Sequence, residues 1–68
     1  MITIKKYTNR KLYVSKYSTY VNLDKLRQML LHGQTFKVEF QGKDITRETV
    51  QKINLKYGLP KEIIVEYI

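Results

Sequence analysis

Residues 4–13 carry the side chains of this sequence that are best suited to bind a polyanion. The segment reads Ile4-Lys5-Lys6-Tyr7-Thr8-Asn9-Arg10-Lys11-Leu12-Tyr13, so four cations alternate with tyrosines and an asparagine. Lysine and arginine neutralise phosphates and release the counterions that surround nucleic acid. Asparagine and arginine hydrogen-bond to base edges, and tyrosine donates to phosphate or stacks on an unpaired base. The segment therefore predicts a nucleic-acid-binding surface, although the same residue types also suit a solvated edge strand whose lysines prevent aggregation.

The distribution of charge favours the binding interpretation. The 68 residues contain 13 Lys and Arg against 6 Asp and Glu, which gives a formal net charge of +7. Residues 1–23 hold five of the basic side chains and no acidic one, whereas every acidic residue lies from Asp24 onward. Such an excess attracts polyanions, of which nucleic acid comes first and an anionic membrane or an acidic protein second. We expect the polyanion-binding surface in the first third of the chain.

The composition argues against several other classes of protein. With no cysteine and one histidine, His32, the sequence offers no disulfide, no zinc site and no nucleophile–base pair. Asp44 and Glu48 read as helix-start and surface acids rather than as paired catalytic carboxylates. We therefore expect no enzyme, no metal and no cofactor. The chain has neither an apolar run long enough to span a membrane nor a secretory signal, so we expect a cytoplasmic protein that does not bind membranes.

The length predicts one small domain over residues 1–68. A domain of this size has a modest core, and small domains without disulfides or metals are often stabilised by a partner subunit. Residues 62–68 form an apolar terminal segment that must be covered by something. On these two grounds we expect a homodimer.

The first half of the chain predicts a β-hairpin followed by a helix. Residues 2–6 alternate as a half-buried strand, residues 8–10 form a turn because Asn9 tolerates turn geometry, and residues 11–14 return as a second strand with Leu12 toward the core. Residues 15–19 are polar and predict a loop. A helix is expected over roughly residues 23–32, with Asn22 as its N-cap and Gly33 after its end.

The second half predicts a strand, a helix and a terminal element. Residues 36–40 alternate as a strand, and a turn follows at residues 41–43. A second helix is expected at about residues 47–57, with Thr46 as its N-cap and Gly58 after its end. Residues 62–68 are rich in β-branched side chains and favour a strand, although their apolar positions also fit helical spacing. The expected fold class is α+β: an N-terminal hairpin, two helices, a central strand and a C-terminal strand.

Two blocks of the sequence resemble a known family. The first is Ile4-Lys5-Lys6-Tyr7 followed by Asn9-Arg10-Lys11-Leu12-Tyr13, and the similarity continues through Tyr20-Val21-Asn22-Leu23 to a second block, Gly42-Lys43-Asp44-Ile45-Thr46-Arg47. In order and in register, they cover roughly residues 2–53 and resemble the N-terminal DNA-binding domain of the polyhydroxyalkanoate (PHB/PHA) synthesis repressors. The resemblance implies a DNA-binding module of a bacterial transcriptional repressor.

Two departures from the family pattern limit what the resemblance implies. The family's C-terminal region, which is associated with polymer granules, lies outside these 68 residues, so the resemblance carries over DNA binding and not control of polymer storage. After Leu12-Tyr13 the family usually has an acidic residue, whereas this chain has Val14-Ser15. The hairpin expected here is therefore still more basic.

We predict sequence-dependent binding of double-stranded DNA by a transcriptional regulator, and a repressor by resemblance. The predicted nucleic-acid-binding residues are Lys5, Lys6, Tyr7, Asn9, Arg10, Lys11, Tyr13 and Arg47. The hairpin cations are expected to anchor phosphates, while Asn9 and Arg10 are the candidates for reading bases. Arg47 is included because a cation is unfavourable at the start of a helix, which makes contact with an anion a plausible reason for its presence.

Two alternatives stay open at the level of sequence. A small protein-interaction module would dock its basic, tyrosine-rich surface on an acidic partner protein, with the interface residues Tyr7, Tyr13, Tyr17 and Tyr20. Binding of RNA, with these rings stacked on splayed bases, is the other. Dependence of DNA affinity on salt separates the classes, because a surface that neutralises phosphates loses affinity steeply as salt rises.

Overall fold

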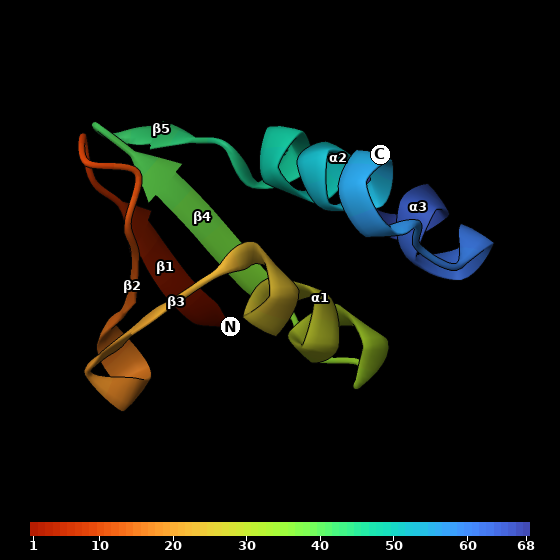
Figure 1. The fold of residues 1–68 in the computed structure, drawn as a ribbon, viewed down its shortest axis with the longest axis horizontal. Helices are drawn as coiled ribbons and strands as arrows, with labels where there is room; N and C mark the ends of the chain where they lie inside the picture. The colour runs from red at the N-terminus through yellow and green to blue at the C-terminus, as the bar shows by residue number, and fades with distance from the viewer.

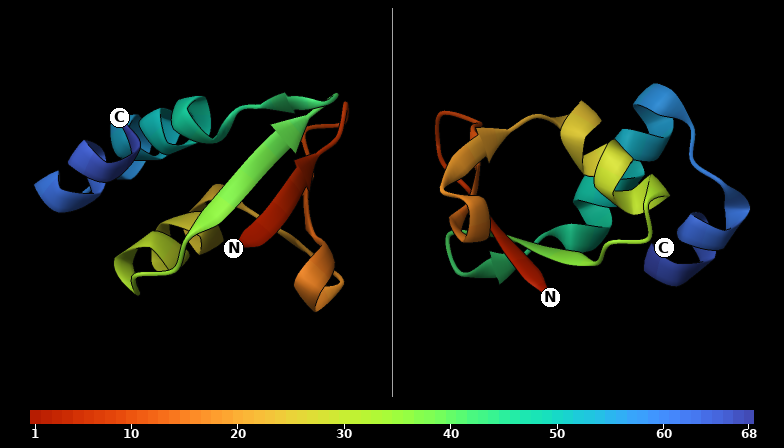
Figure 2. Two further views of the ribbon diagram at one scale, coloured as in Figure 1. Left: turned by 180° about the vertical axis from the view of Figure 1, so that it is seen from behind. Right: turned by 90° about the horizontal axis from the view of Figure 1, so that it is seen from below.

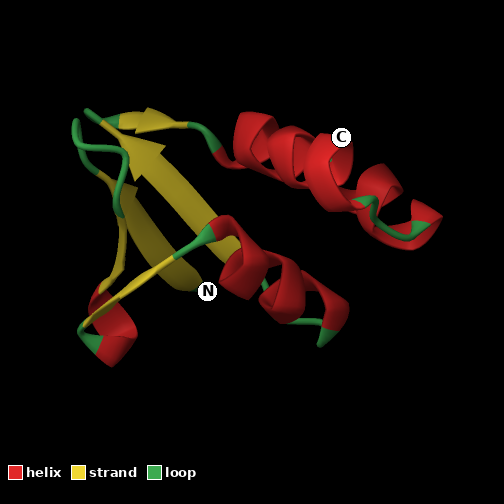
Figure 3. Cartoon of the chain, viewed as in Figure 1, coloured by secondary structure: helices red, strands yellow, loops and turns green.

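A sheet of five strands forms one layer of the protein, and the α-helices form the other (Figure 1). The computed structural model describes residues 1–68. The strands are β1 (Ile2–Lys6), β2 (Leu12–Val14), β3 (Thr19–Val21), β4 (Phe36–Phe40) and β5 (Lys43–Asp44). The helices are α1 (Leu23–Leu31), α2 (Thr46–Tyr57) and α3 (Lys61–Tyr67), with a short 3-10 helix, η1 (Ser15–Tyr17), between β2 and β3. Figures 2 and 3 show the α-helices gathered on one side of the sheet, and the α+β prediction is confirmed.

The topology brings two turns to one end of the sheet. The strand order is β3-β2-β1-β4-β5, and only the central pair, β1 and β4, is parallel. In that pair Lys6 lies opposite Phe40, so both strands finish at the same end. The hairpin turn (residues 7–11) and the β4–β5 turn (Gln41 and Gly42) therefore project side by side, at the upper left of Figure 1.

Alternation of side chains along the strands builds the core between sheet and helices. Ile4 of β1 pairs with Val14 of β2 and with Val38 of β4, and none of the three exposes any surface. Leu26 of α1 and Ile53 of α2 close over them and are equally buried. Because neighbours along a strand point to opposite faces, Lys5 points away from this core and Lys6 points to the helix side.

Helix α1 begins and ends close to the predicted positions. The Asn22 side-chain oxygen accepts a hydrogen bond of 2.8 Å from the backbone N–H of Lys25, which confirms Asn22 as the N-cap. At the other end Gly33 adopts φ +78°, and the N–H of Gln34 reaches the carbonyl of Met29 at 2.9 Å. A left-handed residue in this position is the usual stop signal for a helix.

The predicted C-terminal strand is wrong, because residues 61–67 form helix α3. Strand formation needs a sheet edge to bond with, whereas a helix satisfies its own backbone. The chain leaves α2 through Gly58 and Pro60, which keep it in the helix layer and away from both sheet edges. Ile63 and Tyr67, one helical turn apart, then pack on the core, and the Tyr67 ring stacks on Phe36 at 6.1 Å between centroids.

The predicted N-cap of the second helix is also wrong. Helix α2 begins at Thr46 and its N-cap is Ile45. The Thr46 hydroxyl instead accepts from the N–H of Val38 at 2.9 Å and donates to Asp44 at 2.6 Å, so it fastens the helix start to β4 and β5.

Two short strands were not predicted. β3 pairs with β2, and β5, which is two residues long, pairs with the end of β4. β3 begins at the last residue of the predicted loop and β5 at the last residue of the predicted turn, and their pairing depends on the neighbouring strand rather than on their own composition. None of the helices is both long and apolar enough to cross a membrane.

Candidate nucleic-acid interface

The hairpin end of the sheet and α2 enclose a groove of about 610 Å³ that is rich in positive charge. Its walls hold five cations and no acidic side chain: Lys6, Arg10, Lys11, Lys52 and Lys56. The first three come from β1 and the hairpin turn, and the other two come from α2. We call these five residues and the space between them the basic groove.

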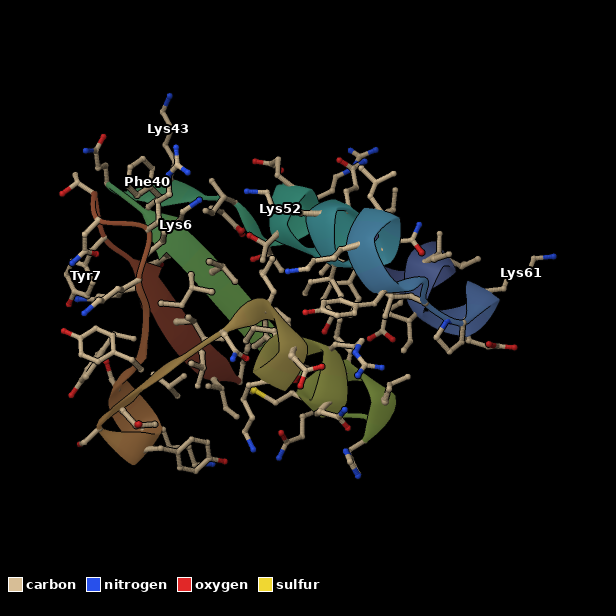
Figure 4. All side chains as sticks on the ribbon, viewed as in Figure 1. Lys6, Tyr7, Phe40, Lys43, Lys52 and Lys61 are labelled. Carbon is tan, nitrogen blue, oxygen red and sulfur yellow. The ribbon has the colours of Figure 1, made fainter.

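Lys6 lines the basic groove, and its pKa responds to the burial and the charges there. Burial, together with the charges of Lys52 and Arg10, lowers the pKa of Lys6 below its ordinary value. Figure 4 shows Lys6 at the end of the sheet with Lys52 facing it from α2. Its Nζ also lies 5.9 Å from the centre of the Phe40 ring. Like charges held this closely repel one another, and an anion between them relieves the repulsion.

Two tyrosines support the cations at the rim of the basic groove. The Nζ of Lys11 lies 5.4 Å from the centre of the Tyr20 ring, and the Nζ of Lys56 lies 5.3 Å from that of Tyr57. Arg27 of α1 also approaches Tyr57, at 4.8 Å. A cation over an aromatic face is attracted by about 0.5–1 kcal/mol at an exposed site. These rings therefore hold cations in place at the groove.

The opposite side of the sheet, the outer face, has a different character. Lys5 and Tyr13 lie on it as register partners, and Lys5 is also opposite Glu39 of β4. Glu39 forms an ion pair with Lys37 at 3.3 Å. The Tyr13 ring packs edge-on against Tyr20, with centroids 5.2 Å apart. A carboxylate therefore offsets part of the positive charge on this face, whereas none lines the basic groove.

The predicted hairpin turn is confirmed, and it fixes the orientation of Asn9. The Asn9 side-chain oxygen accepts a hydrogen bond of 3.1 Å from the N–H of Lys11, so this side chain is directed at its own main chain. Arg10 adopts the left-handed conformation with φ +67°. Tyr7 is 44% exposed beside the turn. Tyr7, Asn9 and Arg10 are all exposed at the turn, but the side-chain oxygen of Asn9 is engaged by the main chain.

Arg47 is exposed at the start of α2 and does not line the basic groove. At ~100° per residue, Lys52 and Lys56 lie on roughly the opposite side of the helix from it. The structure therefore brings together Lys6, Arg10 and Lys11 of the predicted set. It leaves Lys5, Tyr13 and Arg47 on other surfaces.

Lys52 and Lys56 are the groove residues that the sequence analysis missed. Their i,i+4 spacing does place them on one side of a helix, and that signal was present in the sequence. That this side of α2 faces the hairpin follows only from the packing of α2 on the sheet. Arg27 of α1, which approaches Tyr57 at the rim, is instead bound to Asp24 at 2.8 Å.

Comparison with known proteins identifies a family for this chain. The family described as "PHB/PHA accumulation regulator DNA-binding domain" matches residues 3–58, which include every residue of the basic groove. An uncharacterised protein of Allochromatium vinosum is 40% identical over 55 residues, which are 78% of this chain and 36% of that protein. No solved structure matches the chain. The chain belongs to the PHB/PHA accumulation regulator DNA-binding domain family, a family of DNA-binding regulator domains.

Proposed function

We propose that this domain binds double-stranded DNA by seating a phosphate backbone in the basic groove. The observation that carries the proposal is the convergence of five cations from the hairpin and α2 in one hollow without a carboxylate. The lowered pKa of Lys6 supports it, because burial and then the charges of Lys52 and Arg10 disfavour the charged lysine, and an anionic ligand would favour it again. The phosphate contacts proposed here come from the hairpin and α2 together, whereas the sequence predicted phosphate anchors in the hairpin.

The two neighbouring lysines of β1 provide a matched test. Lys6→Gln and Lys5→Gln remove the same charge one residue apart, on opposite faces of the sheet. Binding to a random 20-base-pair duplex would be measured by fluorescence anisotropy at several salt concentrations. We expect Lys6→Gln to lower the salt slope by about 0.9 and to weaken binding about fivefold at 0.15 M salt, as loss of one phosphate contact implies. Lys5→Gln should change affinity less than twofold.

Either of two results would contradict the proposal. Equal losses for the two variants would mean that net charge, and not the basic groove, attracts DNA. Absence of wild-type binding even at low salt would overturn DNA binding through this surface altogether. In that case the alternative of a protein-interaction module gains support, and the outer face with Tyr13 and Tyr20 becomes the surface to test against acidic partners.

The finer role we propose is that of a cytoplasmic transcriptional repressor that reads a defined operator. A randomised duplex pool, with the bound molecules sequenced, tests this role. A homodimer remains part of the proposal, and two half-sites in an enriched motif would support it. The apolar C-terminal segment no longer argues for a dimer, because Ile63 and Tyr67 pack on the domain's own core.

A further inference from the structure

The β4–β5 turn lies beside the hairpin turn, but neither of its residues lines the basic groove. Because β1 and β4 are parallel neighbours, the two turns project from the same end of the sheet, as Figure 1 shows. A hollow of about 460 Å³ separates them, with Tyr7 and Thr8 on one side and Gln41 and Gly42 on the other. Whatever the hairpin turn touches is therefore within reach of the second turn.

Gln41 is an unusual residue for its backbone conformation. It adopts φ +50° and Gly42 follows with φ +80°, the two positive values of a tight hairpin turn. Asparagine or glycine suits the first of these positions best, because other side chains raise the free energy of the left-handed conformation. Arg10 and Ser18 also have positive φ, so the conformation makes Gln41 a candidate for a role outside the turn without assigning one.

The side-chain amide of Gln41 is also free. It is exposed, and it takes part in none of the side-chain hydrogen bonds of the structure. Asn9, the residue that the sequence favoured for reading bases, has its oxygen directed at Lys11. A bidentate contact with adenine needs an oxygen to accept from N6 and an N–H₂ to donate to N7. In Gln41 both the amide oxygen and the N–H₂ are without a hydrogen-bond partner, whereas in Asn9 the oxygen already accepts from Lys11.

We infer that Gln41 reads an adenine in the major groove of DNA while the hairpin turn enters the same groove. This inference rests on the proposed function. The basic groove, which begins at Lys6 beside both turns, holds the flanking backbone. The two turns are centred about two strand spacings apart, or roughly 10 Å. At 3.4 Å per base step, the adenine should lie about three base pairs from the bases contacted by the hairpin turn.

The test compares the sequences that wild type, Gln41→Gly and Thr8→Ala recover from a randomised duplex pool. Gln41→Gly removes the amide and relieves the backbone, so the variant should fold at least as well as wild type, which thermal melting would verify. Thr8→Ala is the control, because it alters the opposite wall of the same hollow without removing an amide. A second reagent is the enriched duplex with 7-deazaadenine at the selected position, which removes N7 alone.

We expect Gln41→Gly to lose the preference for one adenine, with about tenfold weaker binding to the enriched site, while affinity for random duplex stays within twofold. The 7-deaza duplex should weaken wild type and leave Gln41→Gly unchanged. Enrichment of the same motif by wild type and Gln41→Gly, or of no motif by wild type, would overturn the inference while DNA binding stands. Failure of wild type to bind any duplex would overturn the proposed function and this inference with it.

Discussion

The two faces of the sheet differ in what surrounds their positive charge, although both are built from the same strands. On the outer face Lys5 is opposite Glu39, which is bound to Lys37. On the helix side Lys6 faces Lys52 and Arg10, and no carboxylate lines the groove. Two consecutive lysines of β1 thus differ in their surroundings: Lys5 lies beside a carboxylate, whereas Lys6 lies among other cations. The local arrangement of charge, and not the net charge of +7, is the basis on which we propose the basic groove as the polyanion-binding surface.

The strongest test of the difference between the two faces is to remove two positive charges from each face in turn. Lys52→Gln/Lys56→Gln and Lys5→Gln/Lys37→Gln have the same net charge. We expect the first double variant to bind random duplex about 30-fold more weakly at 0.15 M salt, with the salt slope lowered by about 1.8, because two phosphate contacts are lost. The second should lose no more than about threefold. Similar losses for both, measured by anisotropy, would show that the faces are equivalent.

Tyr20 connects the two faces, since its ring packs on Tyr13 and supports Lys11. Tyr20→Ala should lower the free energy of unfolding by about 1 kcal/mol, through loss of the aromatic pair and of the cation contact. Tyr20→Phe retains both contacts and is the matched control. Urea denaturation followed by circular dichroism checks the difference. A Tyr20→Phe variant as unstable as Tyr20→Ala would assign the effect to the hydroxyl instead.

Lys6 should lower the stability of the free protein, unlike Lys5. Its pKa is lowered, so its charged form is less favourable in the folded state than in the unfolded one. The destabilisation is fully present below the folded pKa and disappears as the pH rises from the folded pKa through the ordinary pKa of lysine. At pH 7 we expect Lys6→Met to raise the free energy of unfolding by up to about 0.5 kcal/mol, and Lys5→Met not to raise it. A destabilised Lys6→Met protein would contradict crowding of charge in the groove.

Asp44 provides the opposite case, a lowered pKa that stabilises the fold. Hydrogen bonds from the hydroxyl and the N–H of Thr46, at 2.6 and 2.9 Å, lower the pKa of this carboxyl. A carboxylate of this kind stabilises above its ordinary pKa, and the contribution is lost as the pH falls through the folded value. Asp44→Asn should therefore have a lower Tm than wild type at pH 7, with a gap that narrows toward acid. Melting curves from pH 7 to pH 3 measure it, and a constant gap would exclude the carboxylate as the cause.

Much of the secondary structure was predictable because it depends on local patterns. Strands β1 and β4 follow from alternation, α1 from its Asn22 cap and Gly33 stop, and the hairpin turn from Asn9. The incorrect predictions concern segments in which one local pattern favours a strand and another favours a helix, or in which no local pattern is strong. Residues 61–67 have β-branched composition and helical spacing together, and the position of the segment after α2 decided for the helix. Strands β3 and β5 form because a neighbouring strand is available to pair with them.

The sequence by itself determined the chemistry of this protein and its approximate location along the chain. A hairpin rich in cations, free of acid and in register with a second family block, predicts DNA binding without any coordinates. The tertiary structure decided which cations lie together. It separated Lys5 from Lys6 by the alternation of β1, left Arg47 outside the groove, and brought Lys52 and Lys56 of α2 to the hairpin. The reason is physical: residue type sets the sign of a charge, but only packing sets the distances on which its interactions depend.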